Sequence, residues 1–151
     1  MRTQRFLGSA LVLGLALTLT ACVPPPAERP KPTKDPAAPD PVLVAGGSAE
    51  ENLPFFEFTL DRVGENDDIT GQFTVNTLVD AGFDKAAMQV SFDETKTNLK
   101  ADNIFVSVRV GQECLLGQVV TETGEVAATV EPVVGPEANL CLIGKTRAID
   151  W

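Results

Sequence analysis

Residues 104–120 read IFVSVRVGQECLLGQVV, and this stretch decides the fold. Every second residue from Ile104 to Val110 is β-branched and apolar, which is the period of a strand with one buried face. Gly111-Gln112-Glu113 then supplies a turn or bulge, and Cys114–Val120 continues as extended chain. Two strands joined so closely in sequence pair in an antiparallel manner. The stretch therefore predicts the centre of a small antiparallel sheet.

Further strands are expected on both sides of this pair. Residues 88–92 alternate apolar Met88, Val90 and Phe92 with polar side chains, and a polar loop follows over Glu94–Asp102. After the turn at Thr123-Gly124, residues 126–130 form a weaker strand. A final strand is expected over Leu140–Ile143.

Helices are expected before the strands. Apolar residues spaced by three and four positions indicate one helical face, and they are Leu53, Phe56, Leu60 and Val63. Asn52 can cap this helix, Pro54 fits its first turn and Gly64 ends it. A second helix is expected from Thr70 to Ala81, with Gly82 in the left-handed position after it. The pattern predicts an α+β domain in which two short N-terminal helices pack on a small antiparallel β-sheet.

Ahead of this domain lies a targeting segment. Arg2 and Arg5 precede the 16 mostly apolar residues Phe6–Ala21, which is the layout of a secretory signal. Residues 19–22 read Leu-Thr-Ala-Cys and look like the lipobox of bacterial lipoproteins. A retained transmembrane helix needs about 20 apolar residues. We expect a signal peptide at 1–21 and lipid attachment at Cys22, which places the chain at the cell membrane on the extracytoplasmic side.

A tether is expected over residues 22–52. Eight prolines fall between Pro24 and Pro41, and such a stretch favours an extended polyproline II form. It serves either as a spacer or as a ligand for a proline-binding module. Gly46-Gly47-Ser48 adds a flexible joint, and the globular domain is expected to occupy 53–151.

Two cysteines, Cys114 and Cys141, lie within the expected domain. An even pair in an exported domain is most simply a disulfide. Closing this loop stabilises by about 3.5 kcal/mol in the chain-entropy model. Free thiols are the alternative, although the Cys-x-x-Cys spacing of redox pairs is missing.

Composition excludes several functions. The 21 acidic residues outnumber 12 basic ones, and removal of Arg2 and Arg5 leaves a net charge of about −11, which disfavours nucleic acid and anionic lipid head groups as partners. The chain contains no histidine, the commonest general base and a frequent metal ligand. The acids at Glu65, Asp67 and Asp68 lack the spacing of a calcium loop and fit a solvated turn. No cofactor, metal site or catalytic residue is therefore predicted.

Trp151 has two interpretations. An exposed tryptophan can serve as a platform for a sugar or peptide, whereas a packed one closes the core and pins the end of the chain. Neither interpretation is decided by the sequence.

Three segments together resemble a known family: Ala81–Gln89, the string Cys114-Leu115-Leu116-Gly117-Gln118, and the closing residues Cys141–Trp151, which begin with the related string CLIGK. They resemble a domain of unknown function found in lipoproteins of actinobacteria, and the similarity covers about residues 52–151. The resemblance implies an envelope-anchored domain, without an assigned activity or catalytic residues to transfer.

Three function classes follow from these observations. The first is a membrane-anchored binding module that recruits an envelope protein or cell-wall component. The second is a structural or accessory lipoprotein without a ligand of its own. An enzyme is the third, and nothing in the sequence nominates its catalytic groups. A contiguous exposed apolar patch would favour the first class, and a featureless acidic surface would favour the second.

Overall fold

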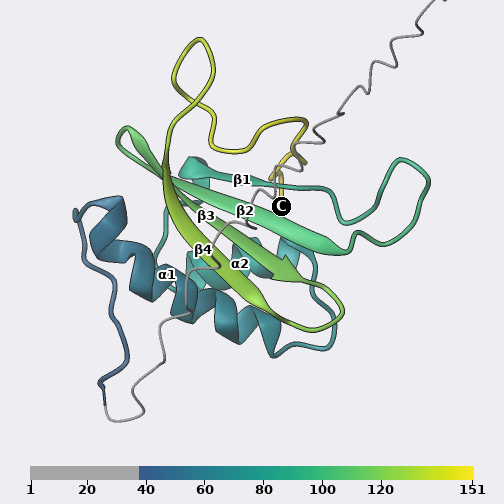
Figure 1. Ribbon diagram of the computed structural model, residues 1–151, viewed down its shortest axis with the longest axis horizontal. Helices are drawn as coiled ribbons and strands as arrows, with labels where there is room; N and C mark the ends of the chain where they lie inside the picture. The colour runs from purple at the N-terminus through teal and green to yellow at the C-terminus, as the bar shows by residue number, and fades with distance from the viewer. Residues whose placement is uncertain (1–37) are drawn as a thin grey trace, which may run out of the picture. The chain divides into compact units, whose positions relative to one another are not determined.

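The computed structural model describes residues 38–151 of the chain (Figure 1). In chain order the elements are α1 (Ala49–Gly64), α2 (Gly71–Asp80), the short 3-10 turn η1 (Lys85–Ala87), β1 (Met88–Val90), β2 (Asn103–Val110), β3 (Glu113–Val120) and β4 (Val126–Pro132). The expected α+β class is confirmed. The helices lie in the middle of the chain rather than at its N-terminus.

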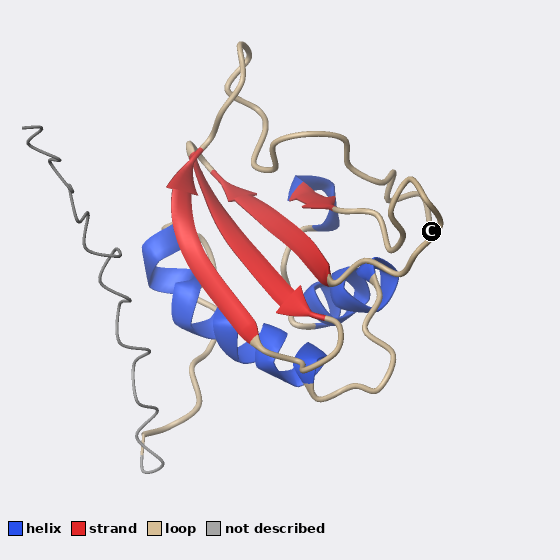
Figure 2. Ribbon diagram, turned by 45° about the vertical axis from the view of Figure 1, so that its right-hand side comes forward, coloured by secondary structure: helices blue, strands red, loops and turns tan. Residues whose placement is uncertain are grey.

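The four strands form one antiparallel sheet in the order β1-β2-β3-β4, so that each strand pairs with its neighbour in sequence. In the central pair Val106 lies opposite Gly117, and Val108 lies opposite Leu115. Both helices cover the same face of the sheet (Figure 2): α1 contacts β3 and β4, and α2 contacts β1 and β2. We call this the helix face, and the opposite side the open face.

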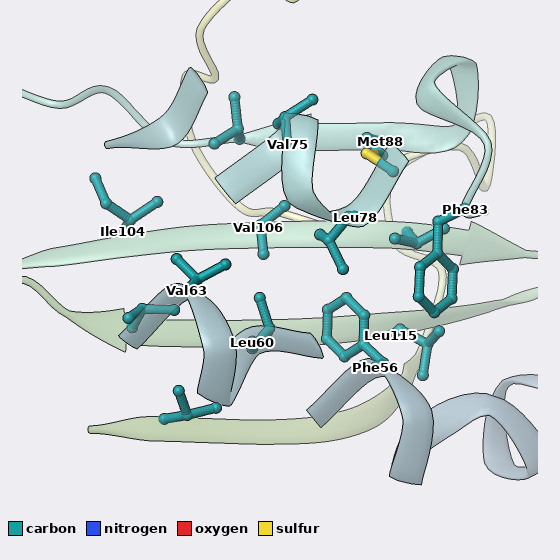
Figure 3. Packing of buried hydrophobic residues seen from close by; sticks show 14 of the residues in the cluster. Phe56, Leu60, Val63, Val75, Leu78, Phe83, Met88, Ile104, Val106 and Leu115 are labelled. Carbon is teal, nitrogen blue, oxygen red and sulfur yellow. The ribbon is translucent and has the colours of Figure 1, made fainter. Parts of the chain in front are cut away.

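The core lies between the helices and the sheet (Figure 3). Its largest fully buried side chains come from both layers and include Phe56, Leu60 and Leu78 from the helices and Ile104 and Leu115 from the strands. The Phe83 ring meets the Phe56 ring edge to face, with centroids 5.7 Å apart. The expected helical face of α1 is therefore confirmed as a core face.

Gly117 sets how closely α1 approaches the sheet. A Cβ at this position would lie 2.3 Å from Leu60 Cδ1 and 3.0 Å from Phe56 Cε1. A Cβ at this position would force the Leu60 side chain to move, so the absence of a side chain on β3 allows Leu60 and Phe56 to pack directly on the strand.

Helix α1 begins four residues before the expected start. Ser48 is its N-cap: the Ser48 hydroxyl accepts from Glu51 N, at 3.2 Å, and Ser48 N–H donates to Glu51 Oε2, at 2.8 Å. This is the reciprocal capping box. The Ser48 backbone N–H lowers the pKa of the Glu51 carboxyl below its ordinary value, and the nearby Ser48 hydroxyl adds a smaller effect in the same direction.

Asn52 does not cap α1, and the expectation was wrong. Its side chain is buried and holds the chain that precedes the helix. Asn52 Oδ1 accepts from Val44 N at 2.9 Å, and its Nδ2 donates to Val44 O at 3.1 Å and to Ser48 O at 3.0 Å. Leu43 packs against the core. The domain therefore begins before residue 53, and Gly46-Gly47-Ser48 forms a bonded turn and cap rather than a flexible joint.

The earlier start also moves Pro54 from the first turn into the body of α1. The end at Gly64 is confirmed, and at this point the helix closely approaches a second glycine. A Cβ on Gly64 would lie 2.2 Å from Gly124 O, and a Cβ on Gly124 would lie 2.1 Å from Gly64 O. The end of α1 thus touches the turn between β3 and β4.

Most of the remaining boundaries agree with expectation. Thr70 caps α2 and Ala81 follows its last turn, with Gly82 at a φ of +104°. Strand β1 ends at Val90, so that Phe92 lies outside it and is 48% exposed.

The expected strand at Leu140–Ile143 does not form. Leu140 makes a single bridge to Val134. The amides of Cys141 and Leu142 instead donate to the side-chain oxygen Oε1 of Gln89, at 2.8 and 3.0 Å. The disulfide to Cys114 draws this segment onto the open face, where its amides bond a side chain instead of a neighbouring strand.

We predict that Gly117→Ala destabilises the domain by about 1–3 kcal/mol, because the added methyl group overpacks the contact between α1 and β3. Urea unfolding measures the change. In a Leu60→Val background the clashing Cδ1 is gone, so the same substitution should cost less. Equal costs in the two backgrounds would mean that Leu60 does not set the approach.

Candidate functional site

The Cys114–Cys141 disulfide fastens the last part of the chain to the open face. Cys114 follows inward-facing Glu113 and precedes buried Leu115 on the helix face, so its side chain points to the opposite side. We call residues 133–151 the strap. Gln89, which accepts the two strap amides, lies on the same side of β1.

A second set of bonds holds the strap at the edge of the sheet. Arg147 N–H donates to Val90 O at 2.9 Å, which adds one antiparallel bridge beside β1. The Arg147 guanidinium pairs with Asp93, and Asp93 also accepts from Gly71 N at the start of α2. Asp93 therefore joins the strap to the helix layer.

Trp151 is packed rather than displayed. Its indole Nε1 donates to Asn76 Oδ1 at 3.0 Å, and the Arg147 guanidinium lies 4.6 Å from the ring centroid. Lys85 Nζ bonds the Trp151 carbonyl oxygen. Because the ring also contacts the core, the pinning interpretation of Trp151 is confirmed.

The strap leaves an apolar groove on the open face. Two adjoining hollows of about 350 and 250 Å³ share Phe105, Leu116 and Leu142 as lining residues. We call this surface the apolar groove. At the strap end it is also lined by Ser91, Cys141, Ile143, Lys145 and Thr146, and at the β4 end by Gly117, Gln118, Ala127, Ala128 and Thr129.

Large apolar side chains in and beside the groove are in contact with solvent. Phe105 is 42% exposed and Ile143 is 93% exposed. Exposure of neighbouring apolar groups is costly in water, and grouped apolar surface of this kind marks interaction sites. The groove is the candidate binding site of the domain.

The groove carries few polar groups that are free to bind. Gln118 Nε2 donates to Asn103 Oδ1 at 2.8 Å, and Ser91 Oγ accepts from Phe105 N at 3.0 Å. Lys145 is the charged residue of the lining. Among residues 38–151 the ion pairs join Lys100 to Asp68 and Arg147 to Asp93, so Lys145 has no carboxylate partner there.

The expected site residues are placed as follows. Cys114 and Cys141 are joined, as predicted. Cys22 lies outside the described residues. Within residues 38–151, no three His, Cys, Asp or Glu side chains are grouped to hold a metal ion. In the same part of the chain, no helix has the length and apolar character needed to span a bilayer.

The lining residues of the groove were not predicted. Phe105 and Leu116 occupy positions on β2 and β3 that a half-buried strand normally gives to polar side chains. These two departures from alternation were a usable signal, since they place apolar groups on the face without helices.

Comparison with protein families decides the identity of this domain. Residues 60–145 match the model of a domain of unknown function, DUF6993. The chain belongs to the DUF6993 family. The matched part of the DUF6993 domain contains all four strands, both disulfide cysteines and the lining of the groove up to Lys145. No curated protein and no solved structure matches the chain.

We predict that Cys114→Ala with Cys141→Ala lowers the free energy of unfolding by about 3.5 kcal/mol, because the open loop gains entropy in the unfolded chain. Limited proteolysis should then cut within the strap, while the sheet resists. Mass spectrometry of the non-reduced parent should find neither thiol free. Equal protease resistance of the strap in both proteins would show that its hydrogen bonds suffice.

Proposed function

We propose that the chain is a membrane-anchored extracytoplasmic lipoprotein whose DUF6993 domain binds a component of the cell envelope through the apolar groove. The observation that carries the binding role is the groove itself. Its apolar lining is exposed beside a strap that a disulfide and an ion pair hold in place. A preformed apolar surface of this kind favours a binding module over an accessory protein with a plain acidic surface.

The anchoring role is supported by the N-terminal sequence. Leu19–Cys22 resembles a lipobox, and a thioether lipid on Cys22 together with further acylation would hold the chain stably in a membrane. The Cys114–Cys141 disulfide suits an oxidising compartment outside the cytoplasm. The resemblance to lipoproteins of actinobacteria favours the same location.

We propose no catalytic role. The chain has no histidine, and the groove is lined by side chains that neither donate nor accept protons readily, apart from Lys145.

We predict that Cys22→Ser moves the protein from the membrane fraction to the soluble fraction of secreting cells. The reason is that serine offers no thiol for thioether formation. Immunoblotting of both fractions measures the shift, and Cys114→Ala with Cys141→Ala provides the control, since those thiols lie in the folded domain. Retention of the Cys22→Ser protein in membranes would contradict the anchor.

We also predict that the groove contacts its partner in cells. A photocrosslinking benzoylphenylalanine in place of Ile143 should give a defined adduct on irradiation of intact cells. The same residue in place of Gln72, an exposed position on α2, should not. Identical products from both positions, or none from Ile143, would favour the accessory role.

A further inference from the structure

We infer that the apolar groove takes the acyl chain of a single-chain anionic lipid and that Lys145 lies beside the lipid head group. This inference rests on the proposed binding role of the groove. It adds the chemical class of the ligand.

The character of the groove floor favours an acyl chain. The floor is the face of a sheet, where the peptide groups of β3 pair with both β2 and β4, and those of the edge strand β4 pair with β3 on one side. A ligand lying here meets mainly apolar side chains, and the Gln118 amide nitrogen and the Ser91 oxygen are already engaged. An acyl chain needs no hydrogen-bond partner.

A peptide fits this floor less well. Each peptide unit brings an N–H and a C=O, and a buried polar group without a partner costs free energy. Peptides that bind sheets usually pair with an edge strand, where free backbone groups are available. The groove lies across the face instead, with Leu116 and Phe105 in both hollows.

Charge indicates the nature of the head group. Lys145 borders the strap end of the groove, is exposed, and has no carboxylate partner among residues 38–151. An isolated cation at one end of the apolar groove complements a ligand with an apolar body and an anionic end. The net negative charge of the chain disfavours an anionic membrane surface as a partner, so the inference concerns a single lipid molecule held at the local positive charge of Lys145.

The lining residues of the two hollows suggest how the lipid lies in the groove. The hollow beside Lys145 adjoins the hollow that ends at Ala127 and Thr129 on β4. An acyl chain with its head at Lys145 would therefore run over Phe105 and Leu116 toward β4. Ala127 is exposed and lies outside the core, so a larger side chain there shortens the groove without disturbing the fold.

The test measures binding of 11-(dansylamino)undecanoate to the full chain carrying Cys22→Ser, which removes any attached lipid as a competitor. Dansyl fluorescence reports occupancy. We expect Lys145→Glu to weaken binding about fivefold or more. Lys96→Glu, in the loop after β1, is the matched control and should stay within about twofold of the parent. Ala127→Trp should weaken binding of the probe as well.

Competition distinguishes the contributions of head and tail. Decanoate should displace the probe at lower concentration than decylamine, which has a similar tail and the opposite charge. Equal displacement by both, or no effect of Lys145→Glu, would overturn the role of Lys145. If neither Lys145→Glu nor Ala127→Trp changes the affinity for the probe, the proposal that the groove binds a lipid is wrong. If Ile143 still crosslinks to a protein in cells, the binding role stands and only the lipid inference falls.

Discussion

The disulfide between Cys114 and Cys141 determines which part of the sheet is covered and which part is open. A four-stranded sheet has two faces, and in this domain the helices cover one of them. The other face carries Phe105 and Leu116, which would be expensive to leave fully in water. By drawing residues 133–151 over part of that face, the disulfide buries its own cysteines and turns the remaining surface into a bounded groove.

The two faces of the sheet are built by different means. On the helix face, packing is achieved by shape: Gly117 lets α1 approach, and the paired glycines Gly64 and Gly124 let its end meet a turn. On the open face, the strap contributes few buried apolar side chains and is held by polar and covalent bonds. Gln89, Asp93 and the disulfide are its main attachments. Because the strap is held by these bonds, it is stable without covering the whole open face, and the uncovered part forms the groove.

Much of the fold could be predicted from the sequence. The β-branched alternation of Ile104–Val110 and the caps of α2 are local signals, and they were sufficient to predict β2 and α2. The start of α1 was missed because Ser48 and Glu51 lie in a stretch that resembles linker, while the apolar face begins only at Leu53. Leu140–Ile143 was misassigned because its conformation is imposed by partners far away in sequence, Cys114 and Gln89. The groove could not be predicted from the sequence either, because it depends on where this segment lies. Only the apolar Phe105 and Leu116 hinted at it.

The strand order has a consequence for how the domain folds. Each strand pairs with its sequence neighbour, so β2, β3 and β4 can assemble through short loops. The bonds of the strap reach much further back, from Cys141 to Gln89 and from Arg147 to Val90. Contacts between residues distant in sequence form late, because they close long loops. We therefore expect the thiol of Cys114 to lie on an assembled sheet before Cys141 reaches it. Oxidation would then fix a position of the strap that the sheet has already selected.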